Sequence, residues 1–229
     1  MTFEELRGLD SRYVIQSYGR NPIALDRGQG ATLYGLDGKE YIDFASGIGV
    51  LSVGAANPQW QAAVAEQAGK LAHVSNLYYS APYVQLAEKL CTRSGMAAAF
   101  FGNSGAEANE GIIKLARKWS WEKYGEGRGT TITLNRSFHG RTITTLAATG
   151  QDVFHKYFFP FTEGFRRADP DLDSVKQAAG HDVCAVLVEL VQGEGVCCLW
   201  TRISSMSWSS CAPTGTGCSW WTRCRPASA

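Results

Sequence analysis

The segment FGNSGAEANE, at residues 101–110, constrains the fold of this chain more than any other stretch. Ser104 is a favourable N-cap residue, and Glu107 three positions later suits a capping box. Gly105 and Ala106 then occupy the first turn with small side chains. Orphan backbone N–H groups and the positive end of the helix dipole favour a bound phosphate at such a terminus. The segment predicts a helix with an N-terminal phosphate site, and the alternative is an ordinary capped helix.

A second polar segment, SFHGRT at residues 137–142, follows the β-branched run Thr130–Leu134, which predicts a strand. A loop at the carboxyl end of a strand is where open α/β sheets place ligands. Phe138 lies in this loop, and a core phenylalanine would not explain the polar residues that follow it. The planar guanidinium of Arg141 can hold a carboxylate through two hydrogen bonds, and the alternative is an exposed arginine in a solvated loop.

Patterns of strands and helices alternate along the chain, which predicts an α/β layer architecture. Asp37-Gly38 suits a hairpin turn, and Asn57-Pro58 and Pro82 mark helix starts. The predicted strands are 33–36, 40–44, 100–101, 130–134 and 184–190, and the predicted helices are 58–71, 82–91 and one from 105 that ends before Gly125.

Charge and hydropathy exclude several classes of protein. The net charge of +1 offers no electrostatic case for nucleic acid or for a membrane surface. No apolar run reaches the roughly 18 residues that a membrane-spanning helix needs, and the first residues do not resemble a secretory leader. We therefore expect a cytoplasmic protein, in which Cys91 and Cys184 act as small apolar residues.

The titratable side chains do not form an evident acid–base pair. Glu189 and Glu194 lie near one strand end, but no histidine completes a catalytic dyad with them. We expect His139 to be a structural, hydrogen-bonded imidazole, and His155 and His181 to be surface residues.

The tail differs in composition from the rest of the chain. Residues 197–229 contain no Asp, Glu or Lys, yet they hold five of the seven cysteines and four of the seven tryptophans. The cysteine spacings fit no zinc or disulfide pattern, and the tail shows no helical or strand periodicity. With permitted synonymous codons, the tail read one nucleotide out of register can spell a segment ending in DEVQTGIG. This composition indicates a frameshift just after Glu194 or Gly195.

Four motifs in order carry a resemblance to a known family: LYGLDGKEYIDFASGIGV, FGNSGAEANE, SFHGRT and VELVQGEG. Together they resemble the class III (ornithine-type, subgroup II) aminotransferases of fold type I over most of residues 10–195. The resemblance implies an α/β, aspartate-aminotransferase-like pyridoxal-phosphate fold in truncated form. Its parts would be residues 1–50 as part of the small domain with a β-hairpin, 51–195 as a partial large domain with the first part of its sheet, and 196–229 as an aberrant tail.

The resemblance also implies the ligands and the roles of the motif residues. It implies pyridoxal 5′-phosphate as cofactor, a small amino-acid substrate, a homodimer, and no metal. The implied reaction moves an amino group from N-acetylornithine or a similar ω-amino substrate to 2-oxoglutarate. The implied cofactor-binding residues are Ser104, Gly105, Ala106, Phe138 and His139, and the implied substrate-binding residues are Arg141 and Glu194.

The resemblance leaves two functional residues without a match. Aminotransferase chemistry needs a lysine for the Schiff base and an acid for the pyridine nitrogen, and neither is found at a family position in this sequence. No catalytic residue is therefore assigned, and we expect the chain as written to be inactive. The alternatives are another class III enzyme, such as an ornithine or 4-aminobutyrate aminotransferase, a racemase or a decarboxylase, and a non-catalytic fragment.

Overall fold

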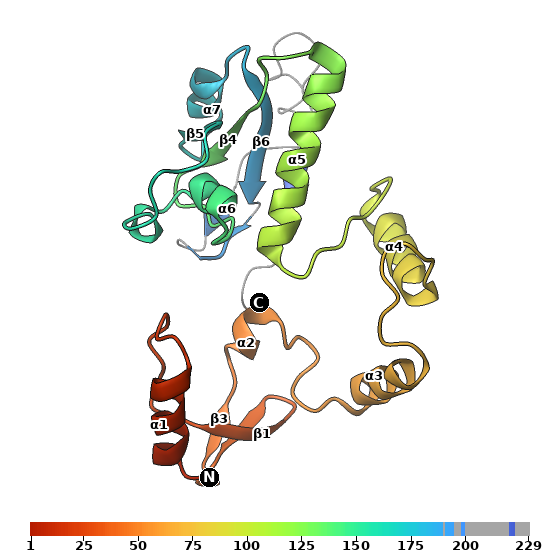
Figure 1. Cartoon of the computed structure of the whole chain (residues 1–229), viewed down its shortest axis with the longest axis vertical. Coiled ribbons are helices and arrows are strands. Elements are labelled where there is room, and N and C mark those ends of the chain that lie inside the picture. The colour runs from red at the N-terminus through yellow and green to blue at the C-terminus, as the bar shows by residue number, and fades with distance from the viewer. Residues whose placement is uncertain (190, 195–197, 200–219, 223–229) are drawn as a thin grey trace. The chain divides into compact units, whose positions relative to one another are not determined.

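The computed structural model describes residues 1–189, 191–194, 198–199 and 220–222. Two compact units follow one another along the chain, one comprising residues 1–84 and the other lying within residues 85–226 (Figure 1). No helix among the described residues is long and apolar enough to cross a membrane.

The first unit is built on a helix and a three-stranded antiparallel sheet. Helix α1 (Phe3–Tyr13) begins at Thr2, which forms a complete capping box with Glu5. The strands β1 (Leu25–Gln29), β2 (Thr32–Gly35) and β3 (Glu40–Ile42) pair in the order β1-β2-β3. The predicted hairpin is thereby confirmed, and Gly38 in its turn has a φ of 79°.

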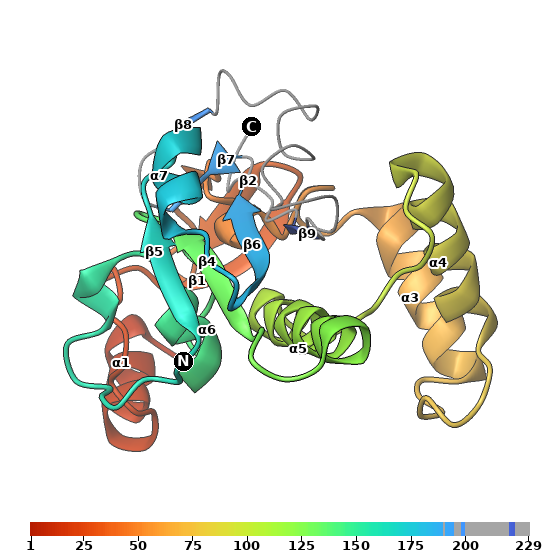
Figure 2. The ribbon, with the colours of Figure 1, turned by 90° about the horizontal axis from the view of Figure 1, so that it is seen from above.

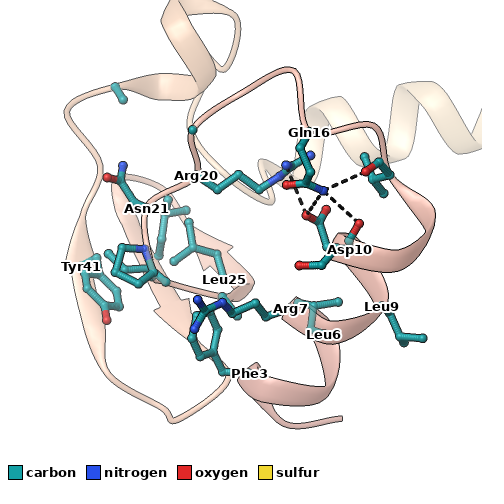
Figure 3. A pocket seen from close by; sticks show the side chains of 18 of the residues that line it. Phe3, Leu6, Arg7, Leu9, Asp10, Gln16, Arg20, Asn21, Leu25 and Tyr41 are labelled. Carbon is teal, nitrogen blue, oxygen red and sulfur yellow. Dashed lines mark hydrogen bonds and ion pairs between the residues drawn. The ribbon is translucent and has the colours of Figure 1, made fainter.

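Helix α1 and these strands surround an open hollow of about 1400 Å³ (Figure 3). Apolar side chains such as Leu6 and Leu25 line it, and both remain more than a third exposed. At its rim Asp10 pairs with Arg20 at 3.2 Å and accepts a hydrogen bond from Gln16 Nε2 at 3.1 Å.

Three helices continue the chain: α2 (Ser46–Gly49), α3 (Pro58–Lys70) and α4 (Ala81–Ser94). The predicted start of α3 is confirmed, because the side chain of Asn57 accepts a hydrogen bond from Trp60 N at 3.0 Å. Pro82 lies in the first turn of α4 as predicted, but this helix runs beyond the predicted end at Cys91.

The second unit is an α/β layer around a parallel sheet in the order β5-β4-β6-β9 (Figure 2). Its helices are α5 (Gly105–Tyr124), α6 (Ile143–Ala148), the 3-10 turn η1 (Asp152–Phe154) and α7 (Leu172–Ala178). Its strands are β4 (Thr130–Leu134), β5 (Phe165–Ala168), β6 (Val183–Glu189) and β9 (Trp220–Thr222), and β7 (Val191–Gln192) pairs separately with β8 (Cys198–Leu199).

Buried apolar side chains join this sheet to its helices. Ile132 and Leu134 of β4 are fully buried and cluster with Val175 of α7. Ala116 of α5 packs with Cys184 of β6, which confirms that this cysteine acts as a small apolar residue. The core therefore fixes the carboxyl ends of β4 and β6 side by side, since the two strands are parallel neighbours.

The predicted strand at residues 100–101 is wrong, because this segment is irregular. A Cβ atom at Gly111 would lie only 2.7 Å from the ring of Phe100, so the ring lies directly on α5. The segment thus packs sideways on the helix instead of joining the sheet.

The tail contains two short strands that its sequence does not predict, since β8 pairs with β7 and β9 pairs with β6. Pairing at an open edge uses backbone groups and needs no side-chain periodicity, which explains why pattern reasoning missed both. The rest of the tail, and with it the frameshift hypothesis, lies outside the described residues.

Candidate functional site

The N-terminus of α5 is capped as predicted. Ser104 has extended backbone angles (φ −150°, ψ 163°), and its Oγ accepts a hydrogen bond from Glu107 N at 3.1 Å. The predicted capping box is wrong in one respect, because the Glu107 carboxylate accepts hydrogen bonds from the backbone and side chain of Asn103, not from Ser104 N. The carboxylate bonds to Asn103, the residue before the N-cap, because Asn103 offers two donors: its backbone N–H and its side-chain amide.

The first turn of α5 is open on its outer side. Ser104 and Gly105 are exposed and Ala106 is half-buried. A Cβ atom placed on Gly105 would meet no other described atom within 4 Å. Since first-turn N–H groups have no acceptor within their own helix, this end of α5 presents donors to open space.

The loop after β4 lies against this same end of α5. The side chain of Asn109 donates to the His139 carbonyl oxygen at 2.7 Å, and Thr142 Oγ1 donates to Glu110 Oε1 at 2.5 Å. Gly140 has a φ of 131°, and a Cβ atom there would lie 2.7 Å from the Cβ of Ala106. Only glycine fits this approach, so the structure brings the two sequence motifs together.

The aromatic and basic residues of this loop lie next to each other. The half-buried Phe138 ring meets the Phe154 ring edge-on, with centroids 5.6 Å apart and planes at 68°. The guanidinium carbon of Arg141 lies 5.9 Å from the Phe138 centroid and 5.3 Å from that of Phe154. The carboxyl end of the parallel sheet thus brings together the α5 N-terminus, the Arg141 guanidinium and the rings of Phe138 and Phe154.

Glu189 ends β6 beside this loop and is 4% exposed. Its Oε2 accepts a hydrogen bond from Phe138 N at 3.1 Å. Burial raises its pKa to about 7, an effect only partly offset by the hydrogen bond and reinforced by the charge of Glu194. The sequence alone does not place Glu189 in the site, because its contact with Phe138 depends on β4 and β6 being neighbours in the sheet. Glu194 itself is exposed in the turn after β7.

His139 is a buried, neutral imidazole. Its side chain belongs to a residue only 1% exposed, and burial lowers its pKa to about 4. The prediction that the imidazole is hydrogen-bonded is wrong within the described residues, where neither ring nitrogen has a partner. The backbone N–H of His139 instead donates to Thr149 Oγ1 at 3.0 Å, so the main chain carries the structural role.

His155 is buried, so its predicted surface position is wrong, whereas His181 is exposed as predicted. Arginine can only donate, so the Nδ1 atom of His155 accepts the 2.8 Å hydrogen bond from Arg167. Its Nε2 then donates to the Leu146 carbonyl oxygen at 3.0 Å. This burial depends on partners distant in sequence, which pattern reasoning could not identify.

The residues present fit a ligand that combines a phosphate with an aromatic ring. They also fit a second ligand that carries a carboxylate next to that ring. Gly105 and Ala106 offer backbone donors, Phe138 offers a ring, and Arg141 offers a guanidinium. Among the described residues, no group of three or more His, Cys, Asp or Glu side chains could hold a metal ion.

Comparison with known proteins adds the family context. The family model described as aminotransferase class-III matches residues 13–200. The acetylornithine aminotransferase of Haemophilus ducreyi is 52% identical over 86% of this chain and 51% of its own length, and that of Wolinella succinogenes is 54% identical over 82% and 48%. The chain therefore spans about half the length of these relatives.

A solved structure of an ornithine aminotransferase from Toxoplasma gondii superposes with a TM-score of 0.81 at 31% identity, covering 86% of this chain and 47% of that one. Its published description mentions partial occupancy of PLP at the active site of that protein. These similarities confirm the predicted α/β fold class.

Proposed function

Because the chain belongs to the class-III aminotransferase family, we propose that it forms the cofactor-phosphate and substrate-carboxylate part of a pyridoxal-phosphate aminotransferase. The observation that carries this proposal is the meeting of the α5 N-terminus with the loop after β4. Asn109, Thr142 and the close approach at Gly140 hold these two segments together.

Each site residue has a proposed task. The backbone N–H groups of Gly105 and Ala106 bind the 5′-phosphate, with Ser104 fixing the helix terminus. Phe138 stacks on the ring, His139 supports the loop beside it, and Arg141 binds the substrate carboxylate. When bound, pyridoxal 5′-phosphate supplies an electron sink for the amino-transfer reaction.

Glu189 extends this set, because its carboxyl group anchors the backbone of Phe138. With a pKa of about 7 it is partly protonated near neutral pH, so it holds the loop with only part of a full negative charge. For Glu194, exposed in the turn after β7, we propose a substrate-side role through an ion pair with a residue of the complete enzyme.

The amino donor that we propose is N-acetylornithine or a similar ω-amino compound, with 2-oxoglutarate as acceptor. The names of the relatives from Haemophilus ducreyi and Wolinella succinogenes support this choice, and the Toxoplasma gondii structure supports ornithine as the second candidate. We further propose that the complete enzyme is a cytoplasmic homodimer. Residues 1–50 would belong to its small domain and residues 51–195 to its large domain.

The amino-transfer activity is proposed for the reading frame that continues the family pattern beyond Gly195. Restoring that frame by one nucleotide and assaying N-acetylornithine, ornithine and 4-aminobutyrate with 2-oxoglutarate tests the proposal. We expect N-acetylornithine to give the highest kcat/KM. If the restored protein retains bound cofactor but transfers no amino group from any of the three, the proposed reaction is wrong.

Arg141→Ala in the restored protein tests the carboxylate assignment. Losing a charge-assisted partner should cost about 2 kcal/mol, or roughly 30-fold in substrate KM, with cofactor content unchanged. Arg93→Ala, at an exposed position in α4, is the matched control. Equal KM values in the two variants would remove Arg141 from the substrate site.

A further inference from the structure

Phe154 makes a contact that the proposed function does not use. It is the last residue of η1, it is half-buried, and its ring meets Phe138 at 5.6 Å. Its centroid is also closer to the Arg141 guanidinium carbon than that of Phe138, at 5.3 Å against 5.9 Å. One ring therefore touches both the proposed cofactor-stacking residue and the proposed carboxylate-binding residue.

The turn that carries Phe154 is anchored on both sides. Asp152, at its start, binds the Arg167 guanidinium at 2.6 Å. His155, directly after it, accepts from Arg167 and donates to the Leu146 carbonyl oxygen of α6. Arg167 itself lies in β5 opposite Thr133 of β4. The position of the Phe154 ring is thus set by the sheet and by α6.

We propose that Phe154 is a positioning residue, which holds the Arg141 guanidinium and the Phe138 ring in the arrangement that binds the substrate carboxylate. This inference rests on the proposed function. An arginine side chain loses considerable rotamer freedom when it binds a ligand, so a side chain already held in place binds more tightly. Attraction between the guanidinium and the face of a ring supplies that hold.

Phe154 contacts the Arg141 guanidinium and the Phe138 ring. Its ring lies against the guanidinium, and the anchored turn keeps this ring next to Phe138. The proposal therefore separates two effects: loss of the ring should weaken carboxylate binding, and it should leave phosphate binding at the α5 terminus unchanged.

The test is made on the chain as it is encoded, with 2-oxoglutarate as the carboxylate probe. NMR signals of the Arg141 side chain report its binding, and the side-chain order parameter of Arg141 reports its mobility. Pyridoxine 5′-phosphate, observed through the amides of Gly105 and Ala106, serves as the phosphate probe.

Phe154→Leu removes the ring and keeps an apolar side chain. We expect it to weaken 2-oxoglutarate binding about fivefold, the value of a guanidinium–ring contact at a partly exposed site. The Arg141 order parameter should fall, and the affinity for pyridoxine 5′-phosphate should stay the same. Phe154→Tyr, which keeps the ring, should restore both Arg141 readouts.

Two further variants keep the test decisive if Phe154→Leu fails to fold. Arg167→Lys removes the guanidinium that donates hydrogen bonds to both Asp152 and His155. It should weaken 2-oxoglutarate binding although Arg167 lies outside the proposed site. Phe158→Leu, at a position 53% exposed in the same segment, is the control and should change nothing.

The outcomes distinguish this inference from the proposed function. If Arg141→Ala weakens 2-oxoglutarate binding but Phe154→Leu and Arg167→Lys do not, the positioning role is wrong and the carboxylate site stands. If Arg141→Ala has no effect, or the chain does not bind 2-oxoglutarate at all, the carboxylate assignment fails and the inference fails with it. An equal loss in Phe158→Leu would also overturn the inference.

Discussion

The two units of this chain differ in how they use similar local patterns. Within residues 1–84 of the first unit only Gly35 is buried, and side chains such as Phe44 and Ile42 are 85% and 63% exposed. The second unit buries its sheet completely at Ile132 and Leu134. Capped helices and paired strands occur in both units, but only the second packs them on a core. The candidate site forms where that core fixes distant segments.

This difference shows that a helix cap leads to a firmly packed helix only where the helix also buries one face on a core. Thr2 and Ser104 cap their helices with the same hydrogen bond, yet α1 buries no residue whereas α5 buries Asn109 and Ile113, among others. Most helix stability in proteins comes from packing of one face, not from propensity. A ligand site that needs fixed geometry therefore belongs to the second unit.

The largest expected effect compares one substitution in the two units. Ile132→Ala removes a fully buried side chain from β4 and should lower the free energy of unfolding by about 2 to 5 kcal/mol. Ile42→Ala, in the exposed strand β3, should change it by less than about 0.5 kcal/mol. Hydrogen exchange of the β4 and β2 amides measures each unit separately. Similar losses in both variants would break the comparison.

The next effect is a pH dependence confined to the second unit. The pKa of Glu189 rises from 4.5 to about 7 on folding, so its contribution to stability is present below pH 4.5 and is lost as pH rises to 7. The pKa of His139 falls from 6.5 to about 4, so its contribution is present above pH 6.5 and is lost as pH falls to 4. Between pH 4.5 and 6.5 the two contributions oppose each other.

A single substitution should remove one of the two opposing contributions and so make the pH dependence of stability from the other measurable. Glu189→Gln leaves His139 unopposed, so stability should rise with pH between 4.5 and 6.5 by on the order of 2 kcal/mol. His139→Leu should give the reverse slope over the same range. Urea unfolding of the wild type and both variants at several pH values measures this. A Glu189→Gln profile as flat as that of the wild type would contradict the opposing pair.

The smallest effect concerns the helix caps. Ser104→Ala removes the acceptor for Glu107 N and should destabilise the second unit by about 1 kcal/mol. Thr2→Ala removes the equivalent bond to Glu5 N, but it should affect only the exchange of α1 amides. Greater loss of β4 protection in Thr2→Ala than in Ser104→Ala would show that α1 supports the core.

The elements with strong local signals could be predicted from sequence. Helix starts are marked by Asn57-Pro58 and by Ser104 through their capping and turn chemistry. A strand is marked by the β-branched run Thr130–Leu134 through its own side chains. Segments whose structure depends on distant partners could not. Phe100 lies on Gly111 instead of forming a strand, and His155 is buried because Arg167 and Leu146 meet it.

The candidate site follows the same division. The cap at Ser104 and the loop at Phe138 could be predicted, because a helix start and the end of a strand are local events. The contacts of Glu189 with Phe138 N and of Phe154 with Arg141 could not, since they depend on strand order and on the position of η1. Tertiary neighbours thus add the residues that hold the site in place.

The central claim is that the α5 terminus and the loop after β4 form one phosphate-binding half-site. The direct measurement is a titration of the chain with pyridoxine 5′-phosphate, which has no aldehyde to react with surface lysines, followed through the amide signals of Gly105, Ala106 and Gly140. We predict saturable shifts at these three amides, and none with pyridoxine, which lacks the phosphate. Equal responses to both compounds, or shifts confined to residues 1–84, would contradict the account.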